Sequence, residues 1–277
     1  MSEALDFRKS LARQLLSAGM TEADFDNHPT VATTLAAAPG LAAHPTIAFP
    51  ATLRPIPVPI DPMPALDAAL PRADVVVITW TVDETMALCD VMTPGFSRDH
   101  WYRYARNFDQ YLPKIRAGAP ARGVMRLASY FPVRIGAKKV LCMKSELHLN
   151  QDGITRPPAG SAHKASLPVR DLFHQILTTD FFEFGTSLNH LEEIGSAVEM
   201  GDAVLGLVVE ERAAAGKPTP RWLVVRNCSD PQINGKLRSK PARQSLQAMW
   251  AVYYYQGFGY WTSMNSALAC WAIIAAN

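Results

Sequence analysis

The segment that most constrains the fold runs from Asp74 to Trp80 and reads Asp-Val-Val-Val-Ile-Thr-Trp. A continuous run of β-branched residues is typical of a strand that is buried on both faces in a parallel or mixed central sheet. Thr81 follows at once, and Glu84 stands three positions later, which is the capping-box pattern of a helix start. Strands alternate with helical patterns beyond this point. We therefore predict an α/β fold with a mixed central sheet flanked by helices.

Composition excludes several classes of protein. The 277 residues are 48% hydrophobic and 19% charged, as in a soluble globular protein. A formal net charge of +2 without a dense basic run argues against a nucleic-acid partner. The four cysteines show no CxxC spacing, so we expect buried free thiols in a reducing compartment. The start shows no secretion pattern, and polar residues interrupt the longest apolar stretch. We expect a cytoplasmic protein without a membrane partner.

The chain divides into an extension, residues 1–70, and a main domain, residues 71–277. Residues 3–18 place leucines at near-helical spacing, and residues 28–66 are rich in alanine and proline, which predicts an extended connector. Residues 126–134 and 138–149 are strand-like runs that predict a hairpin. Lys144 and His148 lie an even number of residues apart on the second run and share a face. We expect that face to be solvated; the alternative is that the two cations meet an anionic group.

A second constraining stretch is Trp222–Asp230. Residues 222–225 predict a buried strand, which turns polar within one residue and ends before Pro231. The carboxyl ends of strands line the ligand crevice in such sheets, and an acid beside an apolar wall can donate a proton near neutral pH. Asp230 is therefore a candidate general acid. The alternative is that Ser229 and Asp230 cap a helix or tighten a turn. Glu84 has the same two interpretations, helix cap or crevice base, and one residue can serve as both.

Three further segments carry candidate residues. Residues 176–182 predict a strand that ends in Phe182, which could stack on a flat ligand or belong to the core. Residues 197–209 predict a short strand followed by a nearly all-apolar helix, in which Glu199 and Asp202 are the only charges. Residues 239–255 predict a helix that Gly257 and Gly259 break before a final apolar helix.

These pieces together resemble the purine nucleoside phosphorylase and adenosylhomocysteine/methylthioadenosine nucleosidase superfamily over residues 74–277. Four places match in order: the strand and glutamate at 75–84, the aromatic segment at 179–182, Ala197-Val-Glu-Met200, and the strand ending in Ser229-Asp230. The closer resemblance is to phosphorylase-like domains of bacterial antiphage defence, some of which cleave adenine nucleotides. The resemblance implies a nucleoside phosphorylase-like fold, a homo-oligomer and a part in nucleotide metabolism or antiviral defence.

Two departures from the family pattern concern the site. The second glutamate of the ribose-binding signature is Gly201 here, with Asp202 next to it. The Gly-rich strand and loop that normally hold phosphate or water have no counterpart, because the helix predicted at 167–175 passes directly to Ile176. The resemblance therefore implies that this chain lacks part of the family core, either by a natural deletion or because the sequence omits a segment. Either case puts catalytic competence in question.

The resemblance also implies roles in cleaving an N-glycosidic bond. Asp230 would protonate N7 of the departing purine, and Glu84 would take the proton of an attacking water, or bind the ribose if phosphate attacks. The remaining implied roles belong to Ser229 (orienting Asp230), Arg243 (steering Asp230), Phe182 (sandwiching the base), and Glu199, Met200 and Asp202 (lining the sugar pocket). No metal or redox cofactor is needed for this chemistry.

The predicted function is a nucleosidase that hydrolyses the bond between a purine, adenine by preference, and its ribose. The substrate is a small molecule, either a nucleoside or a nucleotide. Two alternatives stay open at this point. One is a purine nucleoside phosphorylase, with phosphate as the nucleophile. The other is a catalytically inactive nucleoside-binding or regulatory protein, which the missing Gly-rich loop would explain.

Overall fold

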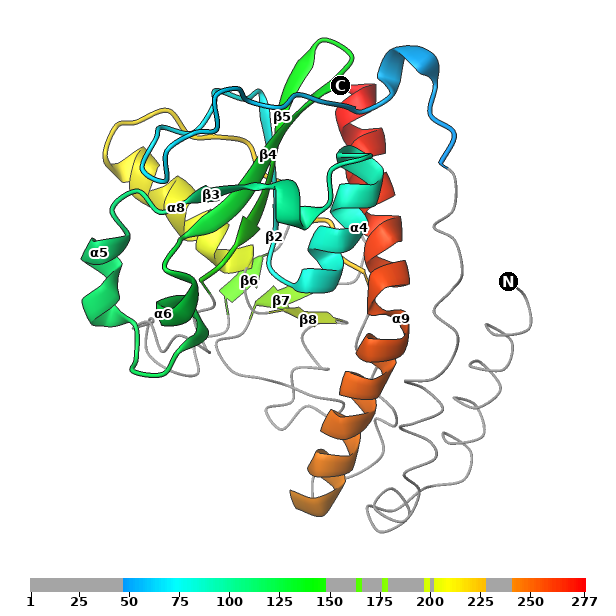
Figure 1. Ribbon diagram of the computed structural model, residues 1–277. Helices are drawn as coiled ribbons and strands as arrows, with labels where there is room; N and C mark the ends of the chain where they lie inside the picture. The colour runs from blue at the N-terminus through cyan, green and yellow to red at the C-terminus, as the bar shows by residue number, and fades with distance from the viewer. Residues whose placement is uncertain (1–46, 148–162, 166–175, 179–196, 200–201, 228–240) are drawn as a thin grey trace.

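The computed structural model describes residues 47–147, 163–165, 176–178, 197–199, 202–227 and 241–277 (Figure 1). The described part is mixed α/β, as predicted, with a five-stranded mixed sheet and a separate three-stranded sheet. The larger sheet consists of β1 (Ile56–Pro57), β2 (Val75–Thr79), β3 (Tyr102–Tyr104), β4 (Ala128–Ile135) and β5 (Lys138–Ser145).

The larger sheet has the order β1-β4-β5-β2, and β3 also pairs with β4. β4 and β5 form the predicted antiparallel hairpin, whose turn contains Gly136 at a φ of 57°. Only glycine adopts that left-handed conformation without a steric cost. β2 pairs with β5 in parallel, with Thr79 opposite Lys144. The carboxyl ends of β2 and β5 therefore lie at the same edge of the sheet.

The core lies between this sheet and two helices, α4 (Val82–Met92) and α9 (Pro241–Ala276), which run along one face (Figure 1). Alternate residues of β4 and β5 point into it, among them Phe131, Val133 and Cys142. β2 is not buried on both faces as predicted, because Val76 is 48% exposed. β2 is an edge strand of the sheet, and its inward-facing residues, Val75 and Val77, pack against the core.

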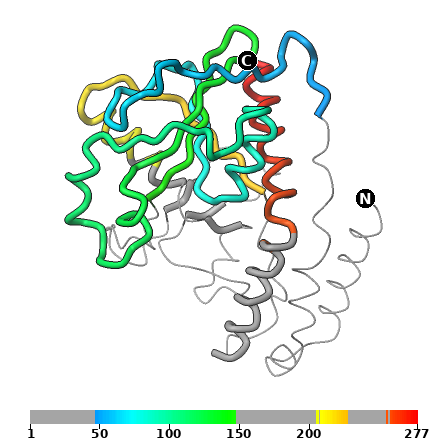
Figure 2. Tube along the Cα trace, in the orientation of Figure 1, coloured from blue at the N-terminus to red at the C-terminus, as the bar shows by residue number. Residues whose placement is uncertain are grey.

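The proline-rich segment joins this core through its last residues. Residues 51–53 form a 3-10 helix, and β1 pairs antiparallel with β4. The segment crosses the C-terminal end of α9 (Figure 2), where the Trp271 indole donates to the Leu53 carbonyl at 2.8 Å. The rings of Phe49 and Trp271 meet edge to face at 4.8 Å between centroids. The helix predicted at residues 3–18 lies outside the described residues.

The smaller sheet contains β6 (His163–Ala165), β7 (Ile176–Thr178) and β8 (Ala197–Glu199), with β6 antiparallel and β8 parallel to β7. α8 (Asp202–Ala214) follows β8, which confirms the predicted passage from a short strand into a helix. The other described helices are α5 (Phe108–Tyr111), α6 (Pro120–Val124) and two 3-10 helices, Arg98–His100 and Leu112–Lys114. No helix in the described part of the chain is long and apolar enough to cross a membrane.

The predicted strand at residues 222–225 is wrong. The segment is irregular, and Trp222 and Leu223 are 38% and 51% exposed. The apolar side chain of Trp222 packs on α8 instead of joining a sheet. Its ring lies against Gly206, and a Cβ added to Gly206 would be 3.5 Å from Cζ2 of Trp222. A β-branched run needs a strand partner as well as an apolar composition, and local sequence does not show whether one is present.

The predicted break at Gly257 and Gly259 is also wrong, because α9 continues through both residues. Tertiary packing overrides the weak helix propensity of glycine when close contact replaces the missing side chain. A Cβ on Gly259 would lie 3.0 Å from Cε2 of Tyr255 and 3.2 Å from Oδ2 of Asp83 in α4. An added methyl group at Gly259 would therefore be tight against both Tyr255 of its own helix and Asp83 of α4.

We expect Gly259→Ala to lower the free energy of unfolding by about 1–3 kcal/mol, because the added methyl group overpacks the α4–α9 contact. Gly206→Ala is the matched control: the new Cβ would sit at an ordinary 3.5 Å from Trp222, and alanine favours a helix by about 1 kcal/mol over glycine. Urea denaturation measures both. If both substitutions stabilised the protein equally, Gly259 would not be packed tightly against Tyr255 and Asp83.

Candidate functional site

Glu84 lies in the first turn of α4, at the carboxyl end of β2, as predicted. Thr81 is the N-cap, and its hydroxyl accepts from the backbone N–H of Glu84 at 3.2 Å. Oε2 of Glu84 in turn accepts from the backbone N–H groups of Trp80 at 2.8 Å and Thr81 at 3.0 Å. This capping box satisfies amides that the helix start leaves without partners. It also fixes the carboxylate, so that Oε1 has a defined position.

Arg226 joins a distant segment to this carboxylate. Its Nη1 lies 3.8 Å from Oε1 of Glu84, and its guanidinium stands over the Trp80 ring, 5.5 Å from the centroid. The two charged side chains are 26% and 22% exposed, so both are within reach of a small molecule from solvent. Arg226 belongs to the irregular segment before Ser229 and Asp230. Thus the stretch that leads to the candidate acid approaches the candidate base.

Arg226 has a larger part in the site than the sequence suggested. The sequence shows it only as the first polar residue after Val225. The available signal for a functional role was that Arg226 is the one basic residue between the apolar residues 222–225 and Asp230. That signal is weak, because the predicted strand gave no indication of which residue Arg226 would contact.

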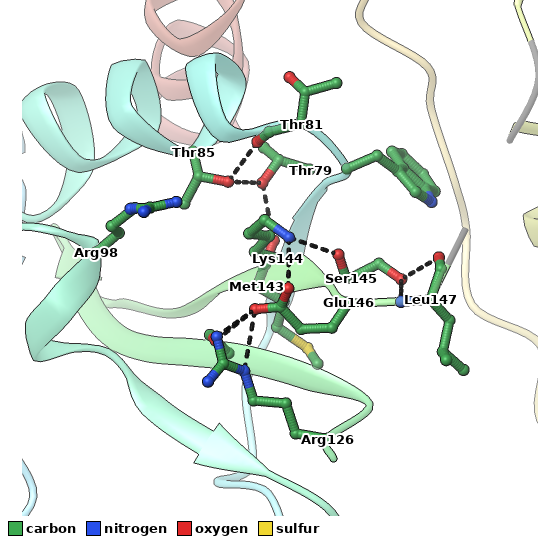
Figure 3. Close-up of polar contacts among 12 residues, drawn as sticks. Thr79, Thr81, Thr85, Arg98, Arg126, Met143, Lys144, Ser145, Glu146 and Leu147 are labelled. Carbon is green, nitrogen blue, oxygen red and sulfur yellow. Dashed lines mark hydrogen bonds and ion pairs between the residues drawn. The ribbon is translucent and has the colours of Figure 1, made fainter. Parts of the chain in front are cut away.

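A buried ionic network lies at the same edge of the sheet (Figure 3). Lys144 Nζ donates to Oε2 of Glu146 at 2.7 Å and to the Ser145 carbonyl at 3.0 Å. Oε1 of Glu146 accepts from Nε and Nη2 of Arg126, at 3.1 and 3.0 Å, and from the Ser129 hydroxyl at 2.9 Å. Lys144 is 7% exposed, so the expected solvated face is wrong at this residue, and the anionic alternative holds. His148 lies outside the described residues.

Threonine hydroxyls connect the end of β2 to the start of α4. Oγ1 of Thr79 and Oγ1 of Thr85 lie 3.0 Å apart, and Thr85 donates to the Thr81 carbonyl at 2.7 Å. Thr85 is fully buried, so its hydroxyl would be costly without these partners. Because Thr79 also pairs with Lys144 in the strand register, the start of α4 and the ionic network belong to one polar region. Figure 3 shows the three threonines beside Lys144 and Glu146.

The ionic network makes stability depend on pH. Burial raises the pKa of Glu146, but hydrogen bonds from Lys144, Ser129 and Arg126, together with the charge of Lys144, outweigh it and hold the pKa below its ordinary 4.5. The depressed pKa means that the carboxylate contributes stability above pH 4.5. This contribution is lost as the pH falls through the folded-state pKa.

We expect Glu146→Gln to lower the free energy of unfolding at pH 7 by about 3 kcal/mol, because it leaves the buried Lys144 and the partly buried Arg126 without their counter-charge. The difference from wild type should shrink as the pH falls below 4.5. Denaturant titrations at several pH values measure it. Glu210→Gln, at an exposed position of α8, is the control and should change stability by at most about 0.5 kcal/mol. If the difference in unfolding free energy between wild type and Glu146→Gln grew as the pH fell, the Glu146 pKa would not be lowered by folding, which would contradict this prediction.

Of the predicted site residues, the structure describes the side chain of Glu84 alone. The backbones of three others are placed: Glu199 ends β8, Asp202 begins α8, and Arg243 lies in the first turn of α9. Phe182, Met200, Ser229 and Asp230 lie outside the described residues, and their roles stay predictions.

A surface hollow lies elsewhere in the described residues. It has a volume of about 720 Å³ and lies around α5, bounded by Asp67, Arg106, Asn107, Phe108, Gln110 and Met125 among others. It contains none of the residues at the carboxyl end of β2. We favour the β2 edge as the functional site, because fixed charged groups from separate segments converge there.

The described cysteines pack within the core as free thiols. Cys89 and Cys142 are buried and Cys270 is partly buried. Burial raises the pKa of Cys89 to about 12 and that of Cys270 to about 11, so neither is a thiolate nucleophile at neutral pH. No three His, Cys, Asp or Glu side chains within the described ranges are grouped to hold a metal ion.

Comparison with known proteins does not assign this chain to a family. No family model, curated protein or solved structure matches the chain. The resemblance found in the sequence therefore stays a prediction, and any functional conclusion depends on the residues themselves.

Proposed function

We propose that the carboxyl end of β2 is the site of a purine nucleosidase, which hydrolyses the N-glycosidic bond of an adenine nucleoside or nucleotide. The contact between Glu84 and Arg226, at 3.8 Å, carries the proposal. It joins the glutamate after β2 to the segment that leads to Ser229 and Asp230. The two carboxylates of the predicted mechanism come from these two segments.

The reaction breaks the bond between C1′ and N9. Its electron pair goes to the purine, which leaves poorly unless N7 gains a proton. Asp230 supplies that proton, while a water attacks C1′ and gives its own proton to Glu84. The products are the free base and ribose, or the free base and the 5′-phosphorylated ribose when the substrate is a nucleotide. Separate acid and base carboxylates follow the general logic of glycoside hydrolysis.

The anchoring of Glu84 supports this role. Two backbone amides hold Oε2, so the remaining oxygen can orient a water without reorganisation of the side chain. Arg226 stands beside that oxygen and can contact the same water. The Trp80 ring under Arg226 limits where the guanidinium moves.

Chromatographic detection of free adenine tests the proposal. Purified protein is incubated with adenosine, inosine, methylthioadenosine, AMP or ATP, each with and without phosphate. We expect adenine release that does not depend on phosphate. Ribose-1-phosphate formed only with phosphate would replace the hydrolase with a phosphorylase. Binding of adenosine without base release would favour the inactive binding protein, in which Glu84 serves as a helix cap only.

A further inference from the structure

Three residues at intervals of four on α9 face the candidate site. Tyr255, Gly259 and Ser263 are one helical turn apart and therefore share a face of the helix. The hydroxyl of Tyr255 donates to Oγ1 of Thr81 at 2.7 Å, and Gly259 gives close approach to Asp83. Oγ of Ser263 accepts from Nδ2 of Asn227 at 3.1 Å.

This face of α9 therefore contacts both segments that build the site. Tyr255 and Gly259 meet the first turn of α4, which carries Glu84. Ser263 meets the irregular segment that carries Arg226, through the residue next to it in the chain. A single rigid helix thus sets the position of one segment relative to the other.

The hydrogen bond between Asn227 and Ser263 anchors the irregular segment to α9. Ser263 is only 3% exposed, and its neighbours on α9, Met264 and Ala267, are core residues. A buried hydroxyl costs free energy unless it is hydrogen-bonded, and Asn227 supplies that bond. Residues 218–227 form neither helix nor strand, so side-chain anchors decide where this segment lies.

We propose that Ser263 and Asn227 are positioning residues, which hold Arg226 against Glu84 and so set the geometry for water attack. The inference rests on the proposed hydrolysis. The Glu84–Arg226 distance of 3.8 Å is near the outer limit of an ion pair, so a small shift of the segment would separate the two groups. A displacement of about 1 Å in a catalytic arrangement can cost about a hundredfold in rate.

A double-mutant cycle on adenine release tests the proposal. We expect Ser263→Ala and Asn227→Ala each to lower kcat by about tenfold to a hundredfold with little change in KM. The double variant should lose no more than either single variant, because both substitutions remove one bond. The same non-additivity should appear when Ser263→Ala is combined with Arg226→Ala. Thr262→Ala is the matched control and should keep full activity, since that hydroxyl bonds only to Gly259 of its own helix among the contacts described.

Each outcome decides between distinct conclusions. Additive losses, or an unchanged kcat in Ser263→Ala, would overturn the positioning role while leaving the nucleosidase in place. Wild-type protein that releases no base from any substrate would remove the proposed function, and the positioning role with it. If Ser263→Ala does not fold, Asn227→Ala removes the same bond from the irregular segment, and its cycle with Arg226→Ala gives the answer.

Discussion

Glu84→Gln should lower kcat for adenine release by about 10²–10⁴-fold and leave the protein folded. Glutamine keeps an oxygen that can accept from the backbone N–H groups of Trp80 and Thr81, so the helix cap survives the change. It removes the negative charge that accepts a proton from water. The substitution therefore separates the two roles that this one residue is proposed to have. Steady-state kinetics together with thermal unfolding measure them.

Two companion variants sharpen this result. Glu84→Ala removes both the base and the cap, and should add a stability loss of about 1 kcal/mol to the same loss of rate. Glu211→Gln, at an exposed position of α8, makes the same chemical change away from the site and should keep wild-type activity. If Glu84→Gln retained turnover while Glu84→Ala unfolded, Glu84 would be a structural cap alone.

Asp230→Asn should abolish turnover of adenosine and leave its binding nearly intact. The amide cannot protonate N7, whereas the shape and the hydrogen-bonding capacity of the side chain are nearly unchanged. The expected loss in kcat is at least about 10²–10⁴-fold. Rapid-quench measurement of base release, together with calorimetric titration of adenosine, measures the two quantities separately.

An activated substrate provides the control for this variant. A nitrophenyl riboside has a leaving group that departs without a proton, so Asp230→Asn should hydrolyse it at close to the wild-type rate. Glu84→Gln should stay impaired on the same substrate, because water still needs a base. Equal loss of folding and of adenosine binding in Asp230→Asn would show that Asp230 is structural.

Local chemistry explains which parts of the fold were predictable. The strand at β2, the capping box of Thr81 and Glu84, and the hairpin at Gly136 each depend on residues within a few positions of one another. Periodicity, cap chemistry and turn chemistry are visible at that range. The placement of Glu84 at the carboxyl end of a strand follows from the same local signals.

The errors share a different cause, which is dependence on partners far away in the sequence. Lys144 is buried beside Glu146, which also accepts hydrogen bonds from Arg126 and Ser129. Periodicity alone cannot distinguish that arrangement from a solvated face. The helix around Gly259 continues because α4 packs against it. Residues 222–225 have the composition of a strand without adopting one. The contact of Arg226 with Glu84 joins residues 142 positions apart, and no local pattern encodes it.

A crystal structure of the protein with a non-hydrolysable adenosine analogue bound would give the decisive distance, from the carboxyl group of Asp230 to that of Glu84. If the two act on opposite sides of one glycosidic bond with a water between, we expect a separation of roughly 6.5–9.5 Å, as in other enzymes that place water between two carboxylates. The analogue should lie between them, with N7 toward Asp230. An Asp230 side chain on the outer surface, remote from Glu84 and from the ligand, would contradict the proposed site.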